Sequence, residues 1–170
     1  MNQSTVKNNV EGENNMKTLC VYYSRTGMTE QIAREIAAGC GADLLRITDG
    51  KDRSGFFGYC AAAMAGLRKK LPVLQPYSLP APLAEYDRVI VLSPIWCENV
   101  CPVIRAFLAA EKEQLRGEVY GVITHMSALP YDKPRAALAH SLGREALPGL
   151  SVQTRKHDWH AEVQNFIAGL

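Results

Sequence analysis

Residues Thr18–Thr29, with the sequence TLCVYYSRTGMT, decide how the rest of the chain is interpreted. The apolar run from Leu19 to Tyr23 has the length and the β-branched and aromatic content of a buried strand. A helical pattern begins directly after the next few residues, and its apolar side chains fall on one helix face: Ile32, Ala33, Ile36, Ala37 and Cys40. The stretch therefore predicts a strand, a short loop and a helix in immediate succession.

The loop between this strand and this helix has the chemistry of an anion site. The first N–H groups of a helix have no partner within the helix, and the helix dipole favours negative charge there. The hydroxyls of Ser24, Thr26 and Thr29 add donors, and Gly27 lets the backbone approach a ligand closely. The loop lacks both the G-x-x-x-x-G-K-[ST] of a P-loop and the G-x-G-x-x-G of a dinucleotide-binding turn. We expect phosphate to bind here; a Ser/Thr-rich turn that only caps the helix is the alternative.

Length and charge limit the classes of protein to which the chain can belong. At 170 residues, it suits a single domain with a full hydrophobic core. Residues 1–16 are polar and Asn-rich, and they predict a disordered N-terminal tail, or an upstream extension before an alternative start at Met16. Residues 17–170 are expected to form the domain. They carry 18 Lys and Arg against 15 Asp and Glu, and a net charge of +3 is too weak to indicate nucleic-acid binding.

The sequence predicts neither a secretory leader nor a metal site. It has no basic-then-apolar N-terminus and no apolar run of about 18 residues, so that a cytoplasmic protein without a membrane span is the simplest interpretation. The cysteines form no zinc pattern, and their odd number does not suggest a disulfide framework. They are Cys20, Cys40, Cys60, Cys97 and Cys101. The last two are not spaced as a redox Cys-x-x-Cys pair, so we expect packing or an inert thiol at both.

The rest of the chain alternates between strand and helix patterns. Further strands are expected at 42–47, 88–92, 119–124 and 150–155, and further helices at 55–70, from 102, at 132–142 and from about 158. Residues 72–85 hold four prolines and predict an extended connection. The alternation predicts an α/β fold with a five-stranded parallel sheet and helices on both faces. In the doubly wound order 2-1-3-4-5, the loops after strands 1, 3 and 4 meet at one edge of the sheet, where such folds bind ligands.

Three segments of the sequence resemble the flavodoxin-like family, of the short-chain flavodoxin or FMN-dependent oxidoreductase type. Residues 23–29, YSRTGMT, are similar to the phosphate loop of that family, which is roughly Ser/Thr-x-Thr-Gly-x-Thr after the first strand. Residues 87–96, DRVIVLSPIW, are similar to its third strand and second flavin loop, often Tyr-Asp-x-Val-x-x-Gly-x-Pro-x-Trp. Residues 55–72 resemble one bacterial branch of the family. The resemblance covers residues 17–170 and implies a flavodoxin-like three-layer fold with FMN as the cofactor.

The resemblance implies that three loops bind FMN, the first at the phosphate and the others on either side of the isoalloxazine ring. The FMN-binding residues that it implies are Ser24, Arg25, Thr26, Gly27, Met28, Thr29, Ser93, Pro94, Ile95, Trp96, Cys97, Glu98, Asn99, Thr124, His125 and Met126. Trp96 is expected to stack on the ring, and its place on a loop predicts that it can be replaced without a cavity in the core. A Trp packed into the base of its own loop is the alternative. No residue is assigned a catalytic role.

Several of these positions have alternative interpretations or depart from the family pattern. Arg25 can neutralise the phosphate, but a side chain at that position commonly faces solvent, and this is the interpretation that we prefer. His125 can donate to the pyrimidine edge or lie free on the surface. Met28 stands where Asn or His is usual, and Cys97-Glu98 where Trp-Gly or Ala-Gly is common. The segment 124–131 lacks the glycines that often let the backbone reach the ring. These departures bear on flavin affinity more than on the fold.

The resemblance implies an oxidoreductase that passes electrons from NAD(P)H through FMN to a small acceptor such as a quinone. One alternative is a flavodoxin electron carrier that docks on a redox partner protein, and another is a flavodoxin-like domain that has lost flavin and serves as a binding module. Flavodoxin carriers are strongly acidic as a family, whereas the net charge here is positive, which favours the enzyme slightly. A homodimer is compatible with all three.

Overall fold

The computed structural model describes residues 16–53, 55, 58, 60, 61, 64, 71–126, 132–155 and 158–170. The tail predicted for residues 1–16 lies outside this part of the chain, except for Met16. Most of the helix predicted at 55–70 also lies outside it. The five described positions within that range are helical.

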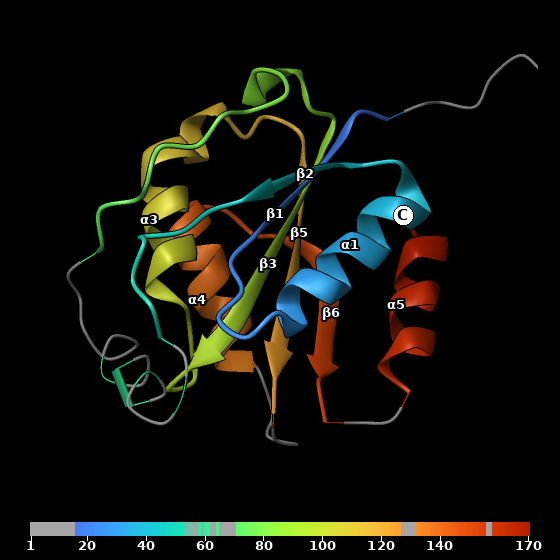
Figure 1. The fold of residues 1–170 in the computed structure, drawn as a ribbon. Coiled ribbons are helices and arrows are strands. Elements are labelled where there is room, and N and C mark those ends of the chain that lie inside the picture. The colour runs from blue at the N-terminus through green and yellow to red at the C-terminus, as the bar shows by residue number, and fades with distance from the viewer. Residues whose placement is uncertain are drawn as a thin grey trace, which may run out of the picture.

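A mainly parallel sheet forms the centre of the molecule (Figure 1). Its strands are β1 (Thr18–Tyr22), β2 (Asp43–Arg46), β3 (Arg88–Trp96), β4 (Asn99–Val100), β5 (Glu118–His125) and β6 (Leu147–Gln153). Five of them run parallel in the order β2-β1-β3-β5-β6, and β4 pairs antiparallel with the end of β3. The predicted order 2-1-3-4-5 is confirmed, because the fourth and fifth predicted strands correspond to β5 and β6.

Helices cover both faces of this sheet and complete a three-layer fold. They are α1 (Met28–Cys40), α3 (Pro102–Glu111), α4 (Asp132–Leu142) and α5 (Trp159–Ala168), and short 3₁₀ turns lie at Leu83–Glu85 and Lys112–Gln114. Helices α1 and α5 pack on one face, and α3 and α4 on the other (Figure 1). Within the described part of the chain, no helix has the length and apolar character needed to cross a membrane.

The central strands owe their continuous apolar sequences to burial on both faces. Leu19 and Val21 of β1 point to the layer of α3 and α4, whereas Cys20 and Tyr22 point to the layer of α1 and α5. Successive side chains of a strand alternate between the two faces, so a strand covered on both sides has no polar position. This is why the two apolar runs at 19–23 and 88–92 predicted the adjacent central strands correctly.

Strand β3 differs from its prediction because it continues to Trp96, four residues beyond the expected end at Leu92. The carbonyl of Leu92 accepts the N–H of Tyr23 over 3.4 Å, so the backbone of Leu92 faces β1. By alternation, the backbone nitrogen of Pro94 also faces the β1 side, but β1 has already ended there. On its other side, β3 stays in register with β5 as far as Pro94, which lies opposite Thr124. A proline is therefore tolerated in this strand, since no ladder hydrogen bond is lost.

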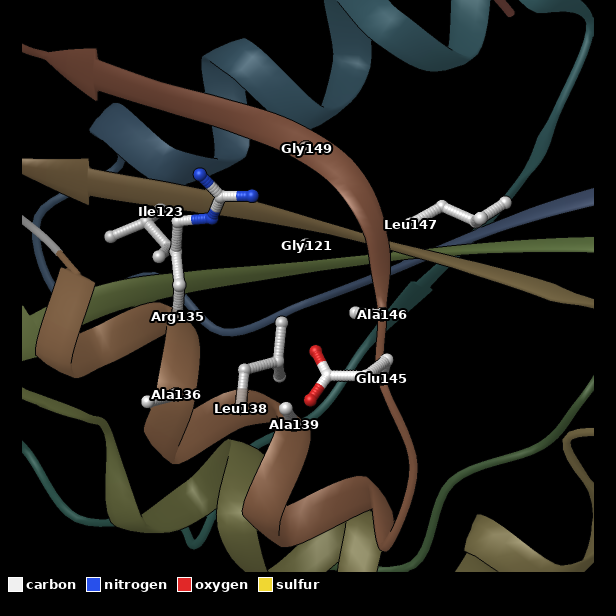
Figure 2. Close-up of a pocket in the computed structure, with 10 residues that line it drawn as sticks. All are labelled: Gly121, Ile123, Arg135, Ala136, Leu138, Ala139, Glu145, Ala146, Leu147 and Gly149. Carbon is white, nitrogen blue, oxygen red and sulfur yellow. The ribbon is translucent and has the colours of Figure 1, made fainter.

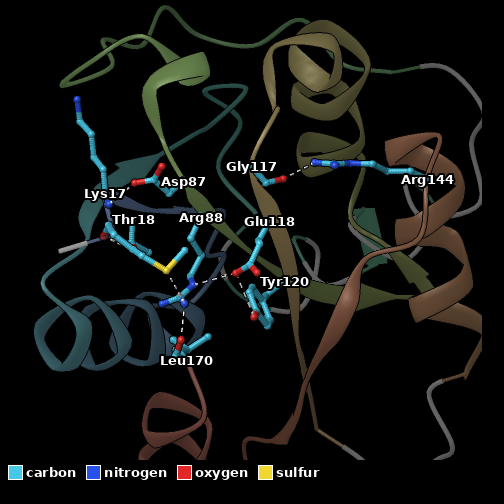
Figure 3. A network of polar contacts seen from close by, with 10 residues as sticks. Lys17, Thr18, Asp87, Arg88, Gly117, Glu118, Tyr120, Arg144 and Leu170 are labelled. Atoms are coloured by element: carbon cyan, nitrogen blue, oxygen red, sulfur yellow. Dashed lines mark hydrogen bonds and ion pairs between the residues drawn. The ribbon is translucent and has the colours of Figure 1, made fainter. Parts of the chain in front are cut away.

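At the opposite edge of the sheet, a buried arginine joins the starts of the strands to the end of the chain (Figure 3). The Nη2 atom of Arg88 donates to the main-chain oxygen of Leu170, beyond the end of α5. Its Nε atom lies 3.6 Å from a carboxylate oxygen of Glu118, and its guanidinium lies 5.7 Å from the ring centroid of Tyr120. These contacts fix α5 against β3 and β5 at the edge where the strands begin.

The pairing of β5 with β6 requires glycine at one position. The register between these strands shifts between Tyr120 and Val122, and a Cβ atom on Gly149 would lie 1.8 Å from the carbonyl oxygen of Gly121. Because the backbone fixes the position of the Cβ atom and the oxygen is itself a backbone atom, no side-chain rotation can relieve the overlap. We expect Gly149→Ala to lower the free energy of unfolding by at least about 2 kcal/mol, measured by urea denaturation.

The matched control for this substitution is Gly169→Ala, where the new Cβ would be no closer than 3.5 Å to its neighbours. Its effect is expected to stay within about 0.5 kcal/mol. Equal stability of the Gly149 variant and the wild type would show that β6 can move away from β5 at little cost.

Candidate functional site

The structure brings the three predicted loops together at the carboxyl ends of β1, β3 and β5. The hydroxyl oxygens of Thr29, in the first turn of α1, and Thr124, in β5, lie 2.8 Å apart and are buried. The rings of Tyr23, after β1, and Trp96, at the end of β3, meet edge to face with centroids 5.5 Å apart. Thr29 of the first loop and the adjacent Tyr23 therefore contact the ends of β5 and β3, as the doubly wound order requires.

The first loop, residues 24–29, leaves the start of α1 open to a ligand. Gly27 is the N-cap residue, with φ of 92°, and no side chain caps the first turn through it. The Oγ atom of Ser24 accepts the N–H of Gly27 over 3.0 Å, which holds the turn in shape. A Cβ atom on Gly27 would meet nothing within 4 Å, so there is open space in front of the backbone. This arrangement fits the binding of an anion such as a phosphate group.

The second predicted loop is for the most part not a loop but a β-hairpin. Trp96 pairs with Asn99 across a two-residue turn, in which Cys97 has φ of 51° and Glu98 φ of 59°. Such turns need positive φ at both central residues and usually contain Gly or Asn. Each non-glycine residue in this conformation costs on the order of 1 kcal/mol, and the missing glycine is tolerated here at that cost. The hairpin is tied at its base, where the Oγ atom of Ser93 accepts the N–H of Cys101 over 3.1 Å.

Trp96 is part of the hydrophobic core, with only 7% of its surface exposed. It packs against Tyr23, and the guanidinium carbon of Arg53 lies 5.3 Å from the centroid of its ring. The expectation that it lies on a loop and can be replaced without a cavity is therefore wrong. The alternative, a Trp packed into the base of its own hairpin, agrees with the structure, because the strand continues through this residue.

The third loop begins at the end of β5. The Nε2 atom of His125 lies 3.0 Å from the Oγ atom of Ser151 in β6, and the carbonyl of His125 accepts hydrogen bonds from the N–H and the hydroxyl of Thr154. His125 is thus held by β6 and is not free on the surface. The side chain of Met126 is 43% exposed. Residues 127–131, which include most of the glycine-poor segment, lie outside the described residues.

Two of the predicted residues are held by contacts that the sequence pattern did not show. Arg25 is half-buried, and its Nη1 atom donates to the main-chain oxygen of Arg53 over 3.0 Å, so the solvent-facing alternative is not what the structure shows. Glu98, the only acidic residue in the three loops, forms an exposed ion pair of 2.8 Å with Lys133 of α4.

A buried ion pair beside the site was missed by the sequence analysis. The guanidinium of Arg53 binds both carboxylate oxygens of Asp49, at 2.7 and 2.5 Å, and both side chains are almost completely buried. Burial, the largest influence, pushes the pKa of Asp49 upward. The hydrogen bonds and charge of Arg53 outweigh it and hold that pKa below its ordinary value of 3.8. The only signal in the sequence was two opposite charges four residues apart, in a segment with the composition of a polar loop.

The two cysteines near the hairpin have different environments. Cys97 is exposed in the turn, whereas Cys101 is buried in the core and its burial raises the pKa of the thiol to about 11. Such a thiol is protonated and unreactive near neutral pH. This agrees with a packing role for Cys101. Within the described residues, no group of three or more His, Cys, Asp or Glu side chains is placed to hold a metal ion.

Two cavities lie away from the three loops. One, of about 280 Å³, lies between α4 and the strands β5 and β6, with Arg135 and Glu145 reaching toward it from α4 and from the segment before β6 (Figure 2). The other is an open groove of about 660 Å³ between the proline-rich connection and α3. Neither is lined by any of the sixteen residues predicted to bind FMN.

Comparison with known proteins identifies the fold. No protein-family model and no curated protein sequence matches the chain. Among solved structures, a flavoprotein of Lactobacillus acidophilus in complex with FMN is 21% identical, with a TM-score of 0.68 over 89% of this chain and 98% of that one. A protein of Bacteroides eggerthii described as a flavoprotein is 18% identical, with a TM-score of 0.67 over 90% and 96%. The two-electron-reduced flavodoxin of Megasphaera elsdenii is 14% identical, with a TM-score of 0.57 over 90% and 99%.

These similarities, with the strand order, define an α/β protein of the doubly wound class. More particularly, the chain has a flavodoxin-like fold along almost its whole length.

The Asp49–Arg53 pair makes stability depend on pH in a predictable direction. Because the pKa of Asp49 is lowered in the folded protein, the pair contributes its full stability above the ordinary value of 3.8 and loses it as the pH falls through the lower, folded value. Asp49→Asn leaves a buried, uncompensated Arg53. We expect it to lower the free energy of unfolding at pH 7 by about 3–5 kcal/mol and to flatten the fall in stability below pH 4.

Urea denaturation from pH 2.5 to 7 measures both effects. Glu85→Gln is the control, because Glu85 forms an exposed ion pair with Lys17 that should be worth less than about 1 kcal/mol. An Asp49 variant with the same pH profile as the wild type would contradict the assignment.

Proposed function

We propose that the chain binds FMN at the carboxyl edge of its sheet and works as a redox protein. The observation that carries this proposal is the convergence of the three loops on an uncapped helix start that faces open space. The flavodoxin-like fold supports it, because a flavoprotein with this fold was crystallised with FMN.

The residues present fit each part of FMN. The N–H groups at the start of α1, with the exposed hydroxyl of Thr26, would hold the phosphate, and Gly27 leaves the space that it needs. The buried hydroxyl pair of Thr29 and Thr124 lies beside this position. The hairpin turn at Cys97 and Glu98, and the end of β5 at His125, would lie on either side of the ring. Trp96 packs in the core at the base of this hairpin.

The charge of the site favours an oxidoreductase that takes electrons from NAD(P)H and passes them to a small acceptor such as a quinone. FMN supplies the electron transfer when bound, and the protein orients it and sets its potential. A unit charge about 10 Å from the reduced, anionic ring changes its energy by about 1–2 kcal/mol at an effective dielectric near 20. Here the one acidic residue of the loops, Glu98, is paired with Lys133, so little negative charge opposes reduction.

An electron carrier is the second candidate. The reduced flavodoxin of Megasphaera elsdenii shares the fold, and an exposed ring edge would suit docking on a larger redox protein. The absence of free acidic side chains in the three loops speaks against a basic partner.

All five cysteines are free thiols, which supports a reducing compartment such as the cytoplasm.

The first test of this function is a titration with FMN, followed by quenching of its fluorescence. We expect saturable binding with Kd in the micromolar range, about 8 kcal/mol. Gly27→Val should weaken FMN binding at least tenfold, because its branched side chain would project into the space for the phosphate. Riboflavin, which has no phosphate, should bind to this variant as it does to the wild type.

The control is Gly41→Val at the other end of the same helix. Gly41 also has positive φ, 65°, with no atom within 4 Å of a Cβ, so this variant carries similar backbone strain. Its affinity for FMN should stay within twofold of the wild type. An equal loss in both variants, or no saturable binding by the wild type, would contradict the proposal.

The second test separates enzyme from carrier. The FMN-loaded protein is mixed anaerobically with NADH or NADPH. It should lose the visible absorption of oxidised flavin, because little negative charge opposes reduction. A titration with dithionite serves as the reference for full reduction. If neither nucleotide reduces the flavin, the carrier becomes the better assignment.

A further inference from the structure

We propose that Arg53 is a positioning residue for flavin binding: paired with the buried Asp49, its side chain anchors the base of the β3–β4 hairpin through Tyr23 and Trp96, and its carbonyl holds Arg25 of the phosphate loop. The inference rests on the proposed FMN site. It concerns the ion pair between Asp49 and Arg53, in which Arg53 contacts Arg25 of the first loop and Trp96 at the base of the hairpin.

Hydrogen bonds among its own residues hold the segment from Asp49 to Arg53 in a turn. Gly50 adopts positive φ, 71°, and the side chain of Asp49 accepts both the fork of Arg53 and, over 3.4 Å, the N–H of Lys51. A bidentate pair fixes the plane of the guanidinium as well as its position. The side chain of Arg53 is 6% exposed and that of Asp49 1%, so water does not compete for this contact.

From this fixed position, Arg53 reaches the ends of the two central strands. Its Nη1 atom donates to the hydroxyl of Tyr23 over 3.3 Å, and its guanidinium lies 5.3 Å from the ring centroid of Trp96. Tyr23 and Trp96 are themselves in edge-to-face contact. Trp96 is the last residue of β3, and Cys97 follows it directly, so the place of its ring sets the place of the turn.

The same residue is joined to the first loop through its backbone. The Nη1 atom of Arg25 donates to the carbonyl of Arg53 over 3.0 Å. Arg53 therefore contacts both the loop expected to hold the phosphate and the base of the hairpin expected to flank the ring. A shift of Arg53 would move them relative to each other, whereas a ligand whose phosphate and ring are joined by a short chain binds both only within a limited range of distances.

The energetics of buried ion pairs favour this role over simple stabilisation. Removing two charges from water offsets most of their attraction, and replacing such a pair with apolar residues of similar size is often neutral for stability. Apolar residues cannot replace the planar guanidinium group, which contacts a carboxylate, a hydroxyl and an indole ring at the same time. We therefore expect replacement of the whole pair to change the geometry of the site more than the folding free energy.

The test uses the double variant Asp49→Leu with Arg53→Met, which leaves no uncompensated charge. We expect it to fold, by circular dichroism, and to bind riboflavin three- to tenfold more weakly than the wild type, because the hairpin beside the ring loses its anchor. FMN should lose at least as much affinity, because the phosphate loop also shifts relative to the hairpin. A loss for FMN alone, or unchanged affinity for both, would overturn the inference. A purely structural pair predicts unchanged affinities once the variant is folded.

A second readout needs no flavin. In a Trp159→Phe background, the emission of Trp96 should become about twofold more accessible to acrylamide in the double variant, since its anchor is gone. Unchanged quenching would overturn the anchoring of Trp96. If the double variant does not fold, Arg53→Lys takes its place; it keeps the charge but loses the fork, and it should move both readouts in the same direction.

The control is Arg88→Met with Glu118→Leu, a buried arginine with a carboxylate and an aromatic ring at the opposite edge of the sheet. Its affinities for both flavins should stay within twofold of the wild type. An equal loss there would overturn the inference. If the wild type binds no FMN, the proposed function fails and a role in flavin binding fails with it, whereas the quenching of Trp96 still decides whether Arg53 anchors the hairpin.

Discussion

The candidate site exists because β1 ends at Tyr22 whereas its neighbour β3 continues to Trp96. As long as both strands run side by side, their backbones are paired and their side chains fill both layers of the core. Where β1 stops, its chain turns away into α1, whereas β3 continues beside β5 as far as Pro94 and then pairs with β4 at Ile95 and Trp96. The start of α1 is thereby placed beside the last residues of β3, and the contacts between the first loop and its neighbours depend on this difference in length.

The elements of the fold could be predicted from the sequence because each is encoded locally. Continuous apolar runs marked the buried strands, and the 3.6-residue pattern marked α1, α3 and α5. The polar loop at 24–29 was placed correctly because its glycine lies at the helix start in the sequence as it does in the structure. What these local patterns share is that neighbours in sequence are also neighbours in space.

The β3–β4 hairpin and the Asp49–Arg53 pair could not be predicted in this way. Ser93 and Pro94 end the apolar run, so the extension of β3 carries no strand signal, and a turn built from Cys97 and Glu98 carries no glycine. The ion pair depends on Tyr23 and Trp96, residues that are 30 and 43 positions from Arg53 in the printed sequence. Trp96 was misplaced for the same reason: whether an aromatic residue after a proline faces a ligand or the core is settled by tertiary contacts.

Pro94 has a consequence for how the molecule meets other chains. An unpaired stretch of strand normally offers alternating N–H and carbonyl groups on which a foreign strand can add, and this is a common route to aggregation and domain swapping. Between its pairing with β1, which ends at Leu92, and its pairing with β4, which begins at Ile95, β3 has only a short stretch of this kind, and the ring nitrogen of Pro94 within it has no hydrogen to donate. This gap between the two pairings of β3 is thus a poor template for intermolecular sheet growth.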